Sequence, residues 1–205
     1  MTPHFWKTAQ THLSNNDPVM TRLIQRYPDD VLRDRGNSLQ TLLRAIVGQQ
    51  ISVKAADSVW LKLEKVSDGI NLETLLNLDI DQLRCAGLSR QKASYIQNIA
   101  CFYSENDITD DYWNSQSYEK SHRELISIKG VGRWTVEMFA IFYLHEPDIF
   151  SSGDIGIQKA ISQLYFGNQP QPKESLEKFS ERWKPYRSVA LWYLWRHIDP
   201  EPVVY

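Results

Sequence analysis

The chain of 205 residues contains only two cysteines, Cys85 and Cys101, and they do not form a Cys-x-x-Cys pair. This excludes a disulfide framework, a cysteine-ligated zinc site and a four-cysteine iron–sulfur cluster. The five histidines show no metal-ligand spacing either, so we expect neither a metal nor a cofactor. Two unpaired thiols fit a reducing compartment, which predicts an intracellular protein, in the cytoplasm with the nucleoid if it is bacterial.

Long apolar runs and a strong net charge are also missing. No segment approaches the ~20 consecutive apolar residues of a membrane-spanning helix, so we expect no membrane association. The formal net charge is -2, which excludes a basic coat over the whole surface. Any contact with nucleic acid must therefore come from local geometry. Phosphate-binding P-loops, dinucleotide-binding fingerprints and serine-hydrolase elbows are absent as well.

Alternating strand patterns are not found, whereas apolar residues recur with helical spacing along nearly the whole chain. We therefore predict an all-α protein of about ten helices. The clearest predicted helices cover residues 39–48, 52–63, 89–103, a segment ending near 128, 134–144, 176–183 and 186–197. The helix at 134–144 is apolar almost all round and should be buried.

Two glycines flank one apolar residue in the segment Leu125–Thr135, between the end of one helix and the start of the next. Glycine permits positive φ and close approach of the backbone to another surface. Val131 can insert into the core, and the free amides of the following helix suit a phosphate. The same spacing also fits a plain tight turn, so by itself the segment indicates at most DNA binding.

Asp154 follows about twenty residues beyond this turn, in the segment Asp148–Ile157. Its position is typical of a helix N-cap, whose carboxylate accepts a hydrogen bond from an amide of the first turn. A buried carboxylate at a helix start could also act in catalysis. The residues alone leave both interpretations open.

Several segments, taken in order, resemble the bacterial 3-methyladenine DNA glycosylase II family of the helix-hairpin-helix glycosylase superfamily. The matching segments are Ala45–Ser52, Leu125–Thr135, Phe150–Asp154, Trp183–Ala190 and, more weakly, Asp17–Pro28. The resemblance extends roughly from Asp17 to His197. Larger members of the family carry an N-terminal β-rich domain for which this chain has no room, so the resemblance is to a short form.

The resemblance implies two helical lobes with an active-site cleft between them, one formed by residues 1–37 with 145–205 and the other by residues 38–144. The second lobe would carry the hairpin at residues 127–135. The expected partner is double-stranded DNA containing alkylated bases, bound by a monomer. The residues expected to contact DNA are Gln50, Ser52, Lys129, Gly130, Val131, Gly132, Arg133 and Thr135, with Gln50 filling the space that a flipped nucleotide leaves.

A base inside a duplex must be flipped into a pocket before an enzyme can act on it. The resemblance implies that Trp134 and Trp195 face this base; Gln49, Met138, Tyr186 and Tyr193 are further candidates. Stacking of a positively charged alkylated purine on indole rings adds about 0.5–2 kcal/mol. Each tryptophan also fits a plain core position. The basic residues between Lys178 and His197 likewise fit either a solvated helix face or a phosphate track.

Asp154 is the catalytic residue that the resemblance implies. A glycosidase normally needs two carboxylates, but a cationic alkylated base leaves as a neutral molecule and needs no acid. Bifunctional relatives carry a Schiff-base lysine where this chain has Trp134, so we expect no strand-cleaving lyase step. The expected function is hydrolytic excision of bases such as 3-methyladenine and 7-methylguanine. The alternatives are a non-catalytic DNA-binding protein and an enzyme for oxidised or mismatched purines. The absence of cluster cysteines and the presence of Trp134 both argue against the second alternative.

Overall fold

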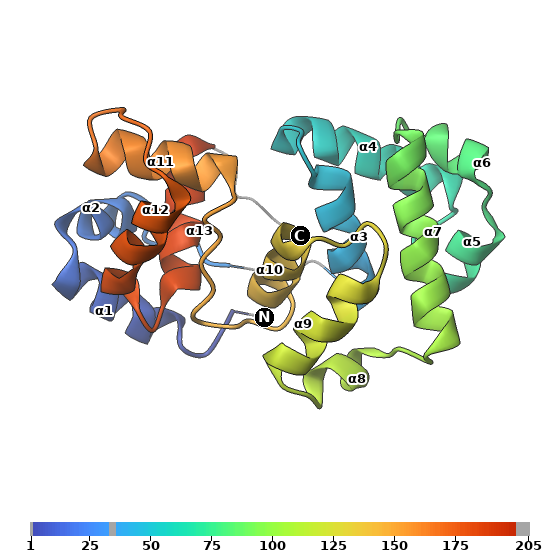
Figure 1. The fold of residues 1–205 in the computed structure, drawn as a ribbon, viewed down its shortest axis with the longest axis horizontal. Helices are drawn as coiled ribbons and strands as arrows, with labels where there is room; N and C mark the ends of the chain where they lie inside the picture. Colours follow the sequence, from blue (N-terminus) through green and yellow to red (C-terminus); the bar gives the residue numbers. More distant parts are fainter. Residues whose placement is uncertain (1, 33–35, 200–205) are drawn as a thin grey trace. The chain divides into compact units, whose positions relative to one another are not determined.

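The computed structural model describes residues 2–32 and 36–199. Within these residues the chain forms thirteen α-helices and one short 3-10 helix and has no β-strand, which confirms the all-α class (Figure 1). The helices outnumber the predicted ten partly because α5 (Leu72–Asn77), α6 (Ile80–Arg84) and α8 (Asp110–Asn114) are only five or six residues long. Helices of fewer than two turns are too short for an apolar period to be recognised.

The described residues divide into two compact units, residues 2–32 with 145–199 and residues 36–144. Gly36 and Asn37 belong to the second unit, not to the first lobe to which the sequence assigned them. The reason is local, because the Asn37 side chain accepts a hydrogen bond from the Gln40 amide and caps the following helix. Of the predicted lobes, residues 1, 33–35 and 200–205 lie outside the described residues.

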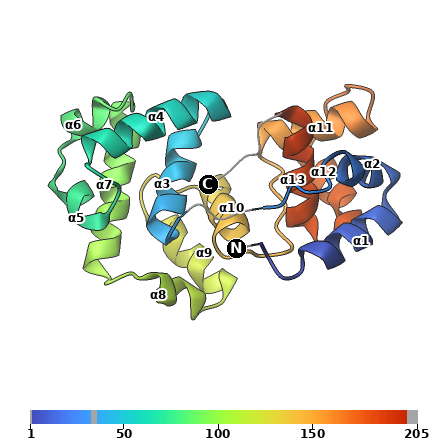
Figure 2. The ribbon, with the colours of Figure 1, turned by 180° about the vertical axis from the view of Figure 1, so that it is seen from behind.

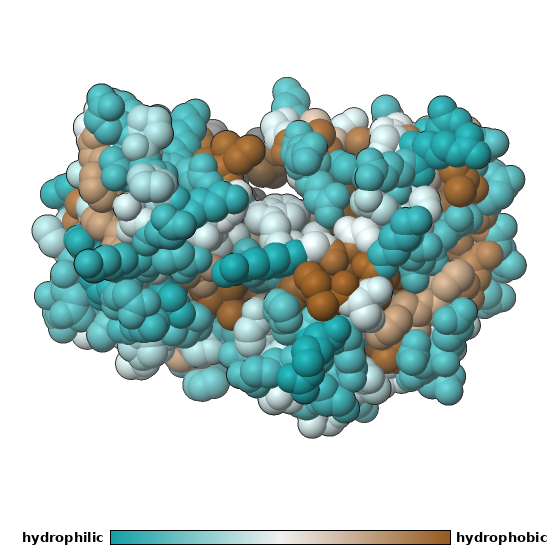
Figure 3. All heavy atoms as spheres, viewed as in Figure 1, coloured by the Kyte–Doolittle hydropathy of each residue, from teal (hydrophilic) through white to brown (hydrophobic). Residues whose placement is uncertain are grey.

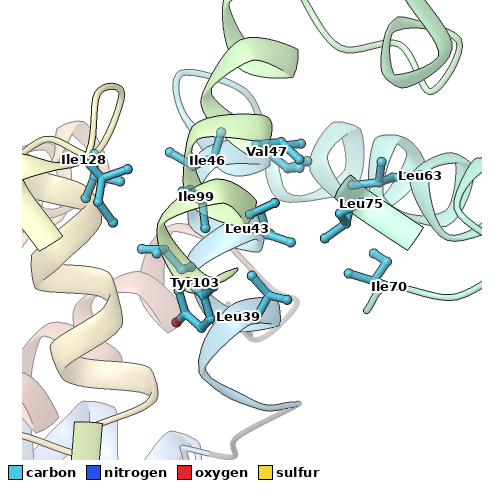
Figure 4. Packing of buried hydrophobic residues seen from close by; sticks show 14 of the residues in the cluster. Leu39, Leu43, Ile46, Val47, Leu63, Ile70, Leu75, Ile99, Tyr103 and Ile128 are labelled. Carbon is cyan, nitrogen blue, oxygen red and sulfur yellow. The ribbon is translucent and has the colours of Figure 1, made fainter. Parts of the chain in front are cut away.

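The second unit is built around α3 (Ser38–Gly48), which packs against three other helices. These are α4 (Val53–Val66), α7 (Arg90–Glu105) and α10 (Arg133–Phe142). Figure 4 shows the core, where Leu43 and Ile46 of α3 lie among apolar side chains of α4, α5 and α7. A further helix of this unit, α9 (Tyr118–Ser127), packs against α10 and leads into the glycine-rich turn.

Local sequence signals define several helix starts in this unit. The side chains of Ser52 and Ser89 accept hydrogen bonds from the amides of Ala55 at 3.3 Å and Lys92 at 3.2 Å, as N-caps do. These two predicted starts are confirmed. Helix α10 is buried as predicted, but it ends at Phe142 and not at residue 144.

The first unit contains α1 (Trp6–Asn16), α2 (Pro18–Arg26), α11 (Ile155–Tyr165), α12 (Lys173–Ser180), the 3-10 helix η1 (Glu181–Trp183) and α13 (Arg187–Ile198) (Figure 2). Helix α13 is its centre and packs against α1, α2, α11 and η1. The prediction of one helix over 176–183 was wrong, because α12 ends at Ser180 and Trp183 lies in η1. There the buried Trp183 indole donates to the Asp17 carboxylate at 2.9 Å.

Most buried side chains are apolar, and the face shown in Figure 3 is mainly hydrophilic. The exposed large hydrophobic residues of the described chain are Ile51, Leu61, Leu76, Ile126 and Ile155. Among the described residues, no helix combines the length and the apolar character that crossing a lipid bilayer requires.

Candidate functional site

The glycine-rich turn forms a helix-hairpin-helix in the second unit. Helix α9 ends at Ser127, the Val131 amide donates to the Ile128 carbonyl at 3.0 Å, and α10 begins at Arg133. Val131 is only 4% exposed and belongs to the core cluster, so its predicted insertion is confirmed. The first amides of α10 have no intrahelical acceptor and carry the positive end of the helix dipole.

The two glycines of the hairpin have different roles. Gly130 adopts φ +107°, and a Cβ at this position would overlap the ring of Tyr95 on α7. Gly132 has φ -97° and ψ 175°, an extended conformation open to any residue, and a Cβ there would meet nothing within 4 Å. Only the first glycine therefore needs positive φ, and the second keeps the start of α10 uncovered.

Charged side chains stand on both sides of the hairpin. Lys129 is exposed, and Arg133 donates from Nε to Glu137 Oε1 at 2.7 Å. The Arg133 side chain is 70% exposed whereas that of Glu137 is 6% exposed. Reasoning from the sequence did not single out Glu137, although its i,i+4 spacing from Arg133 was a usable signal. The pair orients the guanidinium beside the first turn of α10.

The segment Gln49–Ser52 follows α3 and lies against the hairpin. The Gln49 side-chain amide donates to Thr135 Oγ1 at 2.9 Å and to the Gly130 carbonyl at 3.5 Å. Thr135 is only 1% exposed, and its hydroxyl helps to hold the segment against the hairpin. Its contact with DNA stays a prediction. Gln50 and Ser52 are exposed, and Gln50 adopts φ +59°.

Asp154 caps α11 in the first unit. Its Oδ1 accepts from the Ile157 amide at 2.8 Å and from the Trp195 indole Nε1 at 3.1 Å, so the predicted N-cap is confirmed. The residue is half-buried. A Cβ on Gly156 would lie 3.1 Å from Asp154 Oδ1 and 3.4 Å from Trp195 Cδ1. Gly156, which the sequence did not single out, thus leaves room for the indole to reach the carboxylate.

The loop before Asp154 is fastened to the start of α13. Arg187 donates to the Asp148 carboxylate from Nε at 2.8 Å and from Nη2 at 3.0 Å, a bidentate ion pair. Ser188 Oγ accepts from the Ile149 amide at 2.9 Å and donates to the Glu146 carbonyl at 2.6 Å. Because Trp195 lies on the same helix, α13 positions both the loop and the indole that touches Asp154.

The other predicted pocket residues have different surroundings. Tyr186 packs against Phe5 and His12 of the first unit, with ring centroids 6.2 and 5.4 Å away. Tyr193 is fully buried in the core of this unit, where its hydroxyl accepts from Gln10 at 2.7 Å. Its place beside a flipped base stays a prediction.

Trp134 and Met138 lie on α10 of the second unit, Trp134 partly exposed and Met138 fully buried. Trp195 lies in the first unit with Asp154 and donates a hydrogen bond to its carboxylate.

Chemically, the two regions offer complementary groups. The hairpin presents backbone amides and cationic side chains, which suit phosphates. The Asp154 region presents a carboxylate with one oxygen held by two donors, which suits a nearby positive charge. No group of three or more histidine, cysteine or acidic residues that could hold a metal ion occurs among the described residues.

The chain is similar to known proteins over most of its length. The family model described as HhH-GPD superfamily base excision DNA repair protein matches residues 43–185. DNA-3-methyladenine glycosylase 1 of Schizosaccharomyces pombe is 30% identical over 92% of this chain and 86% of its own length. DNA-3-methyladenine glycosylase 2 of Escherichia coli is 26% identical over 75% of this chain, which corresponds to 55% of that protein.

Solved structures of 3-methyladenine DNA glycosylases also match this chain. The Schizosaccharomyces pombe 3-methyladenine DNA glycosylase Mag1, solved in complex with abasic DNA, matches with a TM-score of 0.84 and 30% identity. The match covers 92% of this chain and 95% of that one. A DNA-3-methyladenine glycosidase from Bacillus halodurans matches with a TM-score of 0.73, also at 30% identity, over 91% and 87% of the two chains. The chain therefore belongs to the HhH-GPD superfamily of base excision DNA repair proteins.

Proposed function

We propose that the chain is a monofunctional DNA glycosylase that flips alkylated bases out of duplex DNA and removes them by hydrolysis. The observation that carries this proposal is the Asp154 carboxylate, held at the start of α11 by the Ile157 amide and the Trp195 indole. The named activities of the relatives from Schizosaccharomyces pombe and Escherichia coli support the choice of alkylated bases.

The reaction needs one carboxylate because of the charge on its substrate. A base such as 3-methyladenine or 7-methylguanine carries positive charge on its ring and leaves the sugar as a neutral molecule. The deoxyribose becomes an oxocarbenium-like cation, which the Asp154 carboxylate stabilises while a water molecule attacks. The bonds from Ile157 and Trp195 fix the carboxylate in advance, so little reorganisation accompanies the reaction.

The base itself needs an aromatic surface. Trp195, whose Nε1–H binds Asp154, is our first candidate, and Trp134 on α10 is the second. Stacking on an indole favours a cationic ring over a neutral one by about 0.5–2 kcal/mol. Gln49, Met138 and Tyr186 remain candidates for the surroundings of the base, with no cofactor required.

DNA would be held through its phosphates by the hairpin, which acts without reading sequence. The first amides of α10, left uncovered by Gly132, and the exposed Lys129 and Arg133 supply this contact. Gln50 and Ser52, exposed between α3 and α4, enter the duplex beside the flipped nucleotide. We expect one copy of the chain to act on one site, and binding to weaken as salt rises.

Substitution of Asp154 by asparagine tests the catalytic assignment. Asparagine keeps an N-cap oxygen for Ile157 but loses the charge, so we expect base release from 7-methylguanine DNA to fall about 100- to 1000-fold while lesion binding survives. Asp79→Asn is a matched control, because Asp79 also caps a helix, accepting from the Gln82 amide at 2.7 Å. Native rates in Asp154→Asn, or no base release by the native protein, would overturn the proposal.

A second experiment tests the absence of a lyase step. With Trp134 in place of a Schiff-base lysine, no amine should attack the sugar, so borohydride should trap no covalent protein–DNA adduct. The measurement uses 7-methylguanine duplex and abasic duplex, followed by denaturing electrophoresis. A trapped adduct on either duplex would contradict the monofunctional assignment.

A further inference from the structure

One face of α7 contacts both segments that would meet DNA in the second unit. Lys92, Tyr95 and Asn98 are spaced three residues apart and so lie along one side of the helix. Lys92 Nζ donates to the carbonyls of Val47 and Gln49, each at 2.8 Å. The Tyr95 ring fills the space beside Gly130, and Asn98 Nδ2 donates to the Lys129 carbonyl at 2.9 Å.

Lys92 is well placed to hold the end of α3. The last carbonyls of a helix lack intrahelical donors and carry its negative dipole end, which a cation stabilises. The side chain is partly buried, and this burial lowers the pKa of Lys92 from its ordinary value. A partly desolvated ammonium forms stronger hydrogen bonds than an exposed one, so its two carbonyl contacts are held firmly.

The backbone that Lys92 holds leads directly into a strained residue. Gln50 adopts φ +59°, which a non-glycine residue maintains only when its surroundings fix it. The Gln49 carbonyl belongs to the peptide unit immediately before Gln50, so the Lys92 contact fixes the orientation of that unit. Gln49 in turn reaches Thr135 of the hairpin through its side chain.

Building on the proposed glycosylase activity, we propose that Lys92 is a positioning residue for nucleotide flipping. It holds the segment Gln49–Ser52 in the conformation that enters the duplex, while Tyr95 and Asn98 hold the hairpin on the same helix face. Lys92 touches neither base nor sugar. Removal of the Lys92 ammonium should therefore impair the recognition of a flipped or missing base. Nonspecific binding to DNA phosphates should be unaffected.

The test compares Lys92→Met, which keeps an unbranched side chain and loses the donors, with Lys92→Arg, which keeps the positive charge and several N–H donors. Lys62→Met on α4, an exposed lysine, controls for the loss of one positive charge. The probes are an undamaged duplex and the same duplex with a tetrahydrofuran abasic analogue, with Kd measured by fluorescence anisotropy. Thermal unfolding of each variant shows whether it is folded.

The preference for the abasic duplex is the ratio of the Kd for undamaged duplex to the Kd for abasic duplex. We expect this ratio to fall about tenfold or more in Lys92→Met, because hydrogen bonds from charged groups contribute that much. Affinity for undamaged DNA should stay near native, and Lys92→Arg should restore most of the preference. A native preference in a folded Lys92→Met, or an equal loss in Lys62→Met, would overturn the inference, as would a native protein with no preference. If Lys92→Met does not fold, Lys92→Gln, which keeps a shorter donor, takes its place.

This binding assay does not depend on catalysis, so the two proposals fail separately. Base release from 7-methylguanine DNA by the native protein decides the glycosylase activity. The ratio of the two dissociation constants decides the role of Lys92.

Discussion

The hairpin and the Asp154 region achieve their geometry in different ways. In the hairpin the groups that we propose for DNA binding are backbone amides, fixed because Val131 is buried and Gly130 lies against Tyr95. At Asp154 the offered group is a side chain, fixed by hydrogen bonds from Ile157 and Trp195. Substitutions in the first region should therefore act through backbone conformation and DNA binding, and those in the second through the rate of base release.

Gly130→Ala should have the largest effect on stability. Alanine at φ +107° costs roughly 1–2 kcal/mol, and displacing the Tyr95 ring adds about 1–3 kcal/mol. Urea unfolding measures the sum. Gly69→Ala is the control, because Gly69 has φ +93° with nothing within 4 Å of its Cβ position. Equal losses in the two variants would show that Tyr95 does not fix the hairpin.

Arg187→Met should have the next largest effect, since it removes both donors to Asp148 while keeping an unbranched side chain. The side chains are 15% and 30% exposed, so water screens part of the loss, and we expect about 1–2 kcal/mol. Base release should also fall, because the loop before Asp154 loses its anchor. Arg84→Met, which breaks an exposed pair with Asp81, is the control and should cost little. A base-release rate unchanged by Arg187→Met would contradict the anchoring role.

Trp195→Phe should separate rate from stability in the Asp154 region. Phenylalanine keeps an aromatic ring but has no N–H for Asp154 Oδ1, so we expect base release to slow about tenfold in single-turnover kinetics. Trp60→Phe is matched, since Trp60 is also buried and donates to Glu64 at 2.7 Å in the other unit. If both variants release base equally fast, the indole N–H has no part in positioning the carboxylate.

The features predicted correctly from the sequence are those decided by neighbours along the chain. Ser52, Ser89 and Asp154 precede apolar helices at N-cap positions, and each accepts the hydrogen bond that a cap should accept. The burial of Val131 follows from one apolar residue between two glycines. Such signals extend over about one helical turn, so they can be recognised without knowledge of the tertiary packing.

The features that the sequence did not reveal depend on distant contacts. Nothing near Lys92 in the chain indicates the carbonyls of Val47 and Gln49, which are more than forty residues away. Gly156 matters because Trp195 lies against it, and the buried Tyr193 hydroxyl has its partner in the distant Gln10. Pattern analysis can identify a candidate residue, but its partners are set by how the helices pack.

Gly132→Ser should give the smallest change in stability. It tests most directly whether the hairpin, unlike the Asp154 region, acts through its backbone amides. The Gly132 backbone, with φ -97° and ψ 175°, accepts serine without strain, and serine is at least as good an N-cap as glycine. We therefore expect stability to rise by a few tenths of a kcal/mol. The new side chain would occupy the start of α10 and compete with phosphate for its amides, so Kd for undamaged duplex at low salt should rise about threefold, roughly the worth of one weak contact. A variant that is more stable and binds DNA as well as the native chain would show that the uncovered amides of α10 do not hold phosphate.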